Sequence, residues 1–184
     1  MRKVNAGLKE YNVALKSLNK KLESIGLSIE IRAVGGYAML YNKLRSGGYT
    51  IDVDTVTEDY SEEVNKLISE VSDEEDLEDD WINNDAYELE EVKGIINEIV
   101  WIEDKSFSNI KLFVATEESL LKLKVRAVHF GGLVPRVTDK LDLLDLLGAL
   151  NIHSVEDLAK YEITNKIETE YPRCYDFLVE QGNW

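Results

Sequence analysis

Two short segments rich in β-branched residues flank a glycine pair and a helix-forming run. Residues 28–34 (SIEIRAV) favour a strand, Gly35 and Gly36 follow at once, and residues 37–45 favour a helix. Residues 50–56 (TIDVDTV) then favour a second strand, because apolar and polar residues largely alternate along it. Glycines at a strand-to-helix turn let a ligand approach the backbone closely. This order indicates a fold in which a small sheet packs against helices.

The second of these predicted strands carries Asp52 and Asp54. Alternate residues of a strand point to the same side, so we expect the two carboxylates to lie side by side. Like charges at that separation are unfavourable unless they are neutralised, and a divalent cation is the usual partner. The amides of the helix that follows the glycine turn suit phosphate. The glycine turn and the two carboxylates together predict a site for a nucleoside triphosphate with Mg²⁺ (or Mn²⁺). The alternative interpretation is that the aspartates mark an exposed strand edge and that the glycines form an ordinary turn.

The rest of the chain predicts helices around this small sheet. Further helices are expected at 3–24, 60–71, 86–97, 117–130, 138–148, 154–165 and 167–180, and a hairpin of two strands at 98–103 and 110–115. The expected fold class is α+β, a mixed α/β domain with a helical C-terminal half. We expect residues 1–116 to form an α/β core with an N-terminal helix. Residues 117–184 should form a helical part packed on that core, as one compact unit.

The formal net charge is −15, and all of it lies in residues 58–92, which hold 16 acidic side chains and one lysine. The remainder of the chain is neutral overall and can still bind an anion. Three hypotheses fit the acidic segment: a solvated negative face, a loop that attracts a metal, or a docking surface for a basic protein partner. Trp81 and Ile82 within the segment indicate that it folds back onto the core.

Several classes of protein are not expected from this sequence. No apolar run approaches the about 18 residues that cross a bilayer, and the N-terminal segment is charged throughout. We therefore expect a cytoplasmic protein with no membrane partner. A single cysteine, Cys174, cannot form an internal disulfide, and with only His129 and His153 a zinc site is not expected.

The order strand, glycine pair, helix, strand with two aspartates resembles the signature of the nucleotidyltransferase superfamily, which has the DNA polymerase β-like fold. Residues 45–54 (RSGGYTIDVD) are similar to the Arg-x-Thr-x-Asp-hydrophobic-Asp run of bacterial stand-alone nucleotidyltransferase-like proteins, those related to the toxins of AbiE-type toxin–antitoxin systems. Segments similar to 80–85 (DWINND), 115–128 (ATEESLLKLKVRAV) and 136–147 (RVTDKLDLLDLL) follow in that group. The resemblance covers about residues 28–150. It implies a small nucleotidyltransferase-type sheet flanked by helices.

The resemblance also implies roles for residues of the first motif. Gly35 and Gly36 would cradle the triphosphate, and Asp52 and Asp54 would bind Mg²⁺ and act in catalysis. Thr50 would help to hold the loop or a phosphate.

The helical half supplies the other residues that the resemblance implies. Lys124 would contact a phosphate or the reacting centre, while Arg136, Asp139 and Asp142 would close the site. The alternative is structural. Lys124 and Arg126 would be solvated positions on an amphipathic helix, Asp139 would cap its helix, and Asp142 would pair with a neighbouring lysine.

Active members of the superfamily usually carry a third carboxylate on a neighbouring strand, completing a two-metal site. Residues 110–115 (IKLFVA) offer Lys111 and no acid. Glu103, at the end of the preceding predicted strand, is then the candidate third metal ligand.

The leading hypothesis is an enzyme that transfers a nucleoside monophosphate from a nucleoside triphosphate to an acceptor hydroxyl of RNA, a protein or a small molecule, and that is toxin-like. Residues 122–129 (KLKVRAVH) form the short basic stretch that indicates an RNA-facing surface. The alternative is a non-catalytic nucleotide-binding or protein-interaction module with the same fold. A metal-binding regulator without nucleotide specificity is a third hypothesis.

Overall fold

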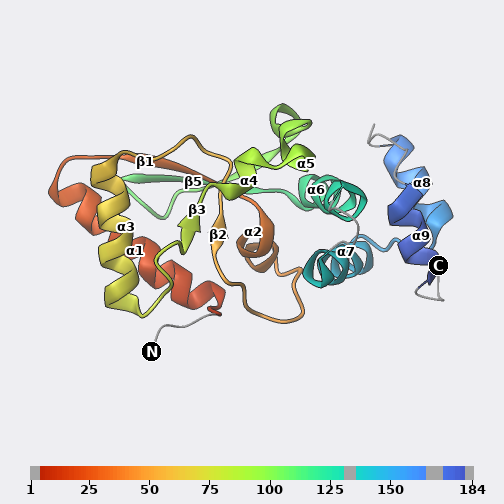
Figure 1. Ribbon diagram of the computed structural model, residues 1–184, viewed down its shortest axis with the longest axis horizontal. Helices are drawn as coiled ribbons and strands as arrows, with labels where there is room; N and C mark the ends of the chain where they lie inside the picture. The colour runs from red at the N-terminus through yellow and green to blue at the C-terminus, as the bar shows by residue number, and fades with distance from the viewer. Residues whose placement is uncertain (1–4, 131–135, 165–171, 181–184) are drawn as a thin grey trace.

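The computed structural model describes residues 5–130, 136–164 and 172–180, which form a mixed α+β fold elongated along one axis (Figure 1). The helices are α1 (Leu8–Ser24), α2 (Gly35–Tyr41), α3 (Glu62–Glu75), α4 (Asp85–Glu88), α5 (Glu90–Lys93), the 3₁₀ turn η1 (Ile96–Glu98), α6 (Glu117–Phe130), α7 (Val137–Ala149), α8 (Val155–Thr164) and α9 (Pro172–Glu180). The strands are β1 (Ile29–Ala33), β2 (Val53–Asp54), β3 (Ile82–Asn83), β4 (Trp101–Asp104) and β5 (Ile110–Ala115). The predicted fold class and helical C-terminal half are confirmed.

The main sheet has the strand order β1–β5–β4. Strand β5 runs parallel to β1, with Ile31 opposite Leu112, and antiparallel to β4, with Glu103 opposite Phe113. The predicted hairpin of β4 and β5 is thus confirmed. Alternate residues of β1 and β5 are buried, so the sheet has one face in the core and one face toward solvent.

A second, two-stranded sheet carries the aspartate motif. Strands β2 and β3 are parallel, and a single antiparallel bridge between Ala33 and Thr55 joins β2 to the end of β1. The predicted strand over residues 50–56 is wrong in length, because only Val53–Asp54 is ladder-paired. Thr50 instead forms an isolated bridge with Ala6. The segment is therefore held by three different neighbours rather than by one continuous ladder.

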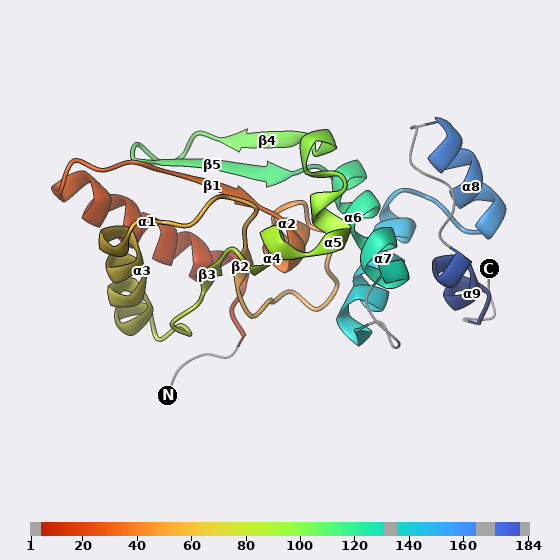
Figure 2. The same ribbon diagram turned by 45° about the horizontal axis from the view of Figure 1, so that its top comes forward.

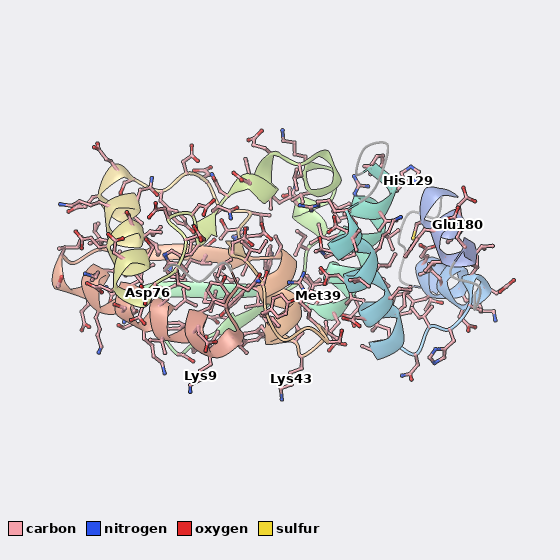
Figure 3. All side chains as sticks on the ribbon, turned by 60° about the horizontal axis from the view of Figure 1, so that its bottom comes forward. Lys9, Met39, Lys43, Asp76, His129 and Glu180 are labelled. Carbon is pink, nitrogen blue, oxygen red and sulfur yellow. The ribbon has the colours of Figure 1, made fainter. Side chains whose placement is uncertain are left out.

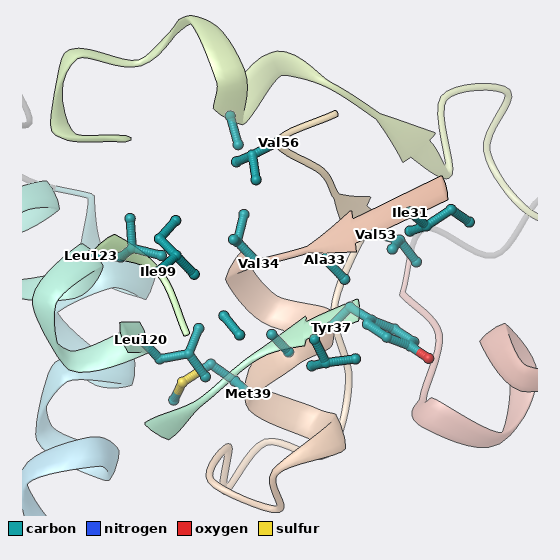
Figure 4. Close-up of a cluster of buried hydrophobic side chains, with 14 of the residues drawn as sticks. Ile31, Ala33, Val34, Tyr37, Met39, Val53, Val56, Ile99, Leu120 and Leu123 are labelled. Atoms are coloured by element: carbon teal, nitrogen blue, oxygen red, sulfur yellow. The ribbon is translucent and has the colours of Figure 1, made fainter. Parts of the chain in front are cut away.

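Helices α1 and α2 cover the buried face of the main sheet (Figure 2). Apolar side chains of β1 and β2 pack against α2, and the same cluster continues to α6 through Met39, Leu120 and Leu123 (Figure 4). Met39 lies at the centre of the molecule, with Asp76 and Glu180 toward opposite ends (Figure 3). The core is therefore continuous across the division between residues 1–116 and 117–184.

Two helices, α6 and α8, begin with side-chain caps. The Thr116 Oγ1 accepts a hydrogen bond from the Ser119 amide at 3.4 Å, and the Ser154 Oγ accepts one from the Asp157 amide at 3.0 Å. The predicted helix over 86–97 is wrong, because that segment forms α4, α5 and η1 as separate short turns. Residues 131–135, between two of the predicted helices, and the first part of the predicted helix 167–180 lie outside the described residues.

The acidic segment is folded rather than extended. Its first part forms α3, which runs on to Glu75, four residues beyond the predicted end at 71. Trp81 is fully buried and donates a hydrogen bond from its indole nitrogen to the Ile68 carbonyl at 3.0 Å, so the segment does return to the core as predicted. Across the described ranges, no helix has the length and apolar character needed to span a bilayer.

Candidate functional site

A cavity of about 320 Å³ lies where the loop before β2 and the strand itself face helices α6 and α7. It draws its lining from segments that are far apart in the sequence. Eight of the residues singled out from the sequence line it: Gly36, Thr50, Asp52, Asp54, Lys124, Arg136, Asp139 and Asp142. Gly35 and Glu103 do not. The motifs of the core and of the helical half thus meet at one place.

Backbone hydrogen bonds on both sides fix the two aspartates at this cavity. The Val34 amide donates to the Asp54 carbonyl at 2.9 Å, which ties the motif to the end of β1. On the other side the Val53 amide donates to the Trp81 carbonyl at 2.7 Å. The Asn83 side-chain amide then donates to Oδ2 of Asp52 at 2.9 Å. The segment 80–85 therefore serves to hold the Asp52 and Asp54 pair in place.

The two carboxylates share a poorly neutralised environment. Burial first and then the nearby Asp52 raise the pKa of Asp54 to about 6, against the lowering effect of Lys124 and Arg136. Burial also raises the pKa of Asp52, against the hydrogen bond from Asn83. Within the described ranges, no hydrogen bond reaches the Asp54 carboxylate. Removal of negative charge at this point, by a proton or a cation, is therefore favourable.

The absence of side chains at Gly35 and Gly36 leaves room for Asp54 and Thr50. A Cβ placed on Gly35 would lie 2.1 Å from Oδ2 of Asp54, and one on Gly36 would lie 2.0 Å from Oγ1 of Thr50. Gly35 also has a φ of +58°, a conformation that L side chains rarely adopt. Helix α2 is only seven residues long, so its dipole contributes less to anion binding than the sequence led us to expect. The glycines are required first for the placement of Asp54 and Thr50.

Lys124 is buried and lies between two carboxylates. Its Nζ is 2.8 Å from Oδ1 of Asp139 and 2.8 Å from Oδ2 of Asp142. The alternative in which Lys124 is a solvated helix position is therefore wrong. Burial would raise the pKa of Asp139, but Lys124 and Arg136 together hold that pKa below its usual value. Asp139 thus remains ionised, and together with Asp142 it positions the lysine at the cavity.

Two further cations complete this network. Arg45 forms a bidentate ion pair with Asp142, and its Nη1 donates to the Tyr49 carbonyl at 3.0 Å. Arg136, whose side chain is 69% exposed, contacts Oδ2 of Asp139 through Nε at 2.7 Å. Arg136 is therefore the accessible cation at the edge of the cavity.

Thr50 acts mainly through its backbone. Its amide and carbonyl both bond to Ala6, each at 2.9 Å, and the hydroxyl of Tyr11 donates to the same carbonyl at 3.3 Å. These bonds to the Thr50 backbone hold the loop, which is one of the two roles expected of Thr50. The Ala6 contact also brings Asn5 to the lining of the cavity.

The predicted third metal ligand, Glu103, is not part of this site. It lies opposite Phe113 at the far edge of the main sheet, is half exposed, and has Lys105 3.6 Å away. Strand β5 lies between it and β1, and the aspartate motif belongs to the separate sheet of β2 and β3. Cross-strand partners share a face, so Glu103 lies on the solvent side with Phe113.

The donor set fits one divalent cation bound together with phosphate. Over the residues described, no group of three or more Asp, Glu, His or Cys side chains is arranged to hold a metal ion by itself. Mg²⁺ is commonly bound by one or two carboxylates together with substrate phosphates rather than by a full protein cage. Asp52 and Asp54, with raised pKa values, supply such a pair.

Several residues that line the cavity could not be predicted from the sequence. Arg45 begins the motif of residues 45–54, but the sequence predicts no role for it because its partner Asp142 lies 97 residues away. Tyr49, Ser46 and Asp145 were not singled out, and no local pattern marks them. Only the folded chain brings these residues to the aspartate motif.

Two predicted surfaces look different in the structure. The cations of 122–129 face inward: Lys124 and Arg126 are each 8% exposed, so this stretch offers little basic surface to RNA. On the acidic segment, Glu70 and Glu74 pair with Lys21 of α1. Those two acids thus hold α3 against α1, while other acids of the segment are solvent-exposed.

Comparisons with protein-family models, with curated proteins and with solved structures give no match for this chain. The resemblance to nucleotidyltransferases therefore rests on the sequence motifs alone.

Proposed function

We propose that the protein is a Mg²⁺-dependent nucleotidyltransferase that transfers a nucleoside monophosphate from a nucleoside triphosphate to an acceptor hydroxyl of RNA, a protein or a small molecule. The observation that carries the proposal is the juxtaposition of Asp52 and Asp54 with Lys124 and Arg136 around one cavity. These residues come from motifs about 70 to 80 positions apart in the sequence. A surface of unrelated function has no reason to unite them.

In this reaction the acceptor oxygen forms a bond to the α-phosphorus, and the bond from that phosphorus to the bridging oxygen breaks as pyrophosphate leaves. A Mg²⁺ ion held by Asp52 and Asp54 with phosphate oxygens would neutralise phosphate charge. Lys124, fixed by its two carboxylate partners, would bind phosphate oxygens. Arg136 would reach the triphosphate from the cavity edge. Holding the reactants in place in this way supplies much of the catalysis in phosphoryl transfer.

The test is calorimetric binding of the four nucleoside triphosphates with Mg²⁺ and with EDTA. We expect binding that requires Mg²⁺ and is lost in an Asp52→Asn/Asp54→Asn double variant, while Asp176→Asn on α9 binds normally. Transfer of α-labelled but not γ-labelled nucleotide to RNA, protein or small-molecule acceptors would then establish the reaction class. A folded wild-type protein that binds no triphosphate would overturn the proposal.

A second candidate function, a non-catalytic nucleotide-binding or protein-interaction module, is favoured by one observation. Asp52 and Asp54 lack the third metal ligand that Glu103 was expected to supply, because Glu103 does not line the cavity. Mg²⁺-dependent binding of triphosphates without label transfer to any acceptor would support this function over the enzyme.

A further inference from the structure

Apolar as well as charged side chains line the cavity. Three large apolar side chains line it while staying more than half exposed: Tyr49 at 53%, Ile51 at 56% and Leu141 at 56%. Single exposed apolar side chains are common on protein surfaces. Three that border the same cavity, drawn from the loop before β2 and from α7, form a patch that a bound ligand would cover.

The loop that carries Tyr49 is pinned on both sides of that residue. Before it, Ser46 donates from its amide and its hydroxyl to Oδ2 of Asp145, each at 3.0 Å. After it, Thr50 is bridged to Ala6. At Tyr49 itself, the backbone carbonyl accepts from Arg45. The backbone that carries the ring is therefore already ordered at the cavity, so little backbone freedom is lost on binding.

The lining of the cavity offers both kinds of group that one class of molecule needs. Asp52, Asp54 and Lys124 suit a metal-bound triphosphate. Tyr49, with its aliphatic neighbours, offers an aromatic surface at the same cavity. A nucleoside triphosphate is charged at one end and carries a flat aromatic base at the other.

We propose that Tyr49, flanked by Ile51 and Leu141, is the platform on which the nucleobase of the substrate stacks. The inference rests on the proposed function and adds to it the base subsite and its selectivity. Stacking on an aromatic ring tolerates every base, because each base has a π face. The protein therefore uses all four nucleoside triphosphates with similar affinity. An acceptor side chain or a protein partner on the same patch would instead leave nucleotide binding independent of Tyr49.

The experiment compares nucleoside triphosphates with inorganic tripolyphosphate, which lacks base and sugar, each titrated with Mg²⁺ by calorimetry. Removal of a stacking aromatic typically weakens binding by about 5- to 150-fold, equivalent to about 1–3 kcal/mol. We expect Tyr49→Ala to lose affinity for each of the four nucleotides in that range and to bind tripolyphosphate as the wild type does. Tyr49→Phe, which keeps the ring, should bind nucleotides nearly normally.

A matched pair on α7 tests the aliphatic side of the platform. Leu141 lines the cavity, whereas Val137, one turn earlier and 71% exposed, does not. Leu141→Ala should weaken nucleotide binding several-fold and Val137→Ala should leave it unchanged.

The outcomes separate the two proposals. If wild-type protein binds the nucleotides and Tyr49→Ala binds them equally well, the base platform is wrong while the proposed function stands. A preference of more than about 100-fold for one base would also overturn it, since stacking alone cannot discriminate to that degree. If the wild type binds neither tripolyphosphate nor any nucleotide, the proposed function itself fails.

Discussion

Arg45 and Asp142 form a bidentate ion pair that joins the loop before β2 to helix α7. Nε lies 2.8 Å from Oδ1 and Nη2 lies 2.7 Å from Oδ2. The two side chains are 15% and 3% exposed, and Lys124 contacts the same carboxylate. Paired hydrogen bonds between charged groups fix orientation as well as distance. This contact therefore sets how the helical half faces the aspartate motif across the cavity.

Loss of this pair should destabilise the protein. Arg45→Ala leaves Asp142 buried with Lys124 as its remaining cation, and removing one partner of a buried pair costs about 3 kcal/mol or more. Urea unfolding should show this loss. The control is Arg32→Ala, because Arg32 pairs with Glu30 at the surface, where both side chains are more than one-third exposed. That control should cost less than about 1 kcal/mol. Equal, small effects for the two variants would show that the buried pair does not hold the halves together.

Gly35 is expected to tolerate no side chain. Gly35→Ala would place a methyl group 2.1 Å from the Asp54 carboxylate and would occupy a positive φ. The conformational cost is about 1–2 kcal/mol and the overpacking about 1–3 kcal/mol. Thermal unfolding should show the summed loss, and Mg²⁺-dependent nucleotide binding should weaken as Asp54 shifts.

The control for this change is Gly26→Ala. Gly26 has a similar φ of +70°, but no described atom lies within 4 Å of a Cβ placed there. Gly26→Ala should therefore lose only the stability that the positive φ costs an alanine, and the variant should bind nucleotide normally. If the two alanine variants were equally stable and equally active, close packing of Asp54 on Gly35 would be refuted.

The sequence was sufficient to predict the fold class and the members of the carboxylate and lysine cluster. The alternation around Asp52 and Asp54 and the apolar spacing of the helices are local signals, and local signals determine elements. The resemblance to nucleotidyltransferases then implied that Lys124 and Arg136 would join them. Each of these residues lines the cavity.

Long-range pairing explains what could not be predicted. Residues 50–56 do not form one strand because Thr50 bridges to Ala6 while Val53 pairs with β3, and no pattern within the segment encodes those partners. Glu103 was the candidate because it ends the predicted strand 98–103, while residues 110–115 carry no acid. Its distance from the site depends on the strand order β1–β5–β4, which alternation alone does not reveal. Arg45 belongs to a motif that can be seen in the sequence, but its partner is brought next to it only in the folded chain.

Asp54→Asn should stabilise the metal-free protein at neutral pH. The pKa of Asp54 is raised to about 6, so the folded protein binds that proton more tightly than the unfolded chain does. The contribution of Asp54 to wild-type stability should therefore be fully present below about pH 4 and should be lost as the pH rises through 6. Asparagine carries no charge and lacks this fall, which gives a gain of up to about 3 kcal/mol above pH 7.

The measurement is urea unfolding in EDTA between pH 4 and 8, repeated with Mg²⁺ and nucleotide. In the repeat the order should reverse, because only the wild type gains stability from the ligand. Asp176→Asn, an exposed aspartate on α9, should follow the wild type throughout. An asparagine variant less stable than the wild type in EDTA would contradict the view that Asp54 is poorly neutralised.

Glu162 of α8 should make a separate contribution to pH dependence, away from the cavity. It is fully buried, and the Tyr175 hydroxyl donates to its Oε2, while Oε1 has no hydrogen-bond partner among the described residues. Burial raises the pKa of Glu162 more than the Tyr175 hydrogen bond lowers it. The folded state thus prefers the protonated carboxyl, and stability is lost as the pH rises from about 4 through the raised pKa.

Glu162→Gln keeps an acceptor for Tyr175 without the charge, so it should be more stable than the wild type at pH 7 and similar to it at pH 4. Chemical denaturation at the two pH values measures the difference, with Glu180→Gln, an exposed position on α9, as the control that should change little. A glutamine variant that is less stable at pH 7 would mean that the ionised carboxylate is stabilised where it lies.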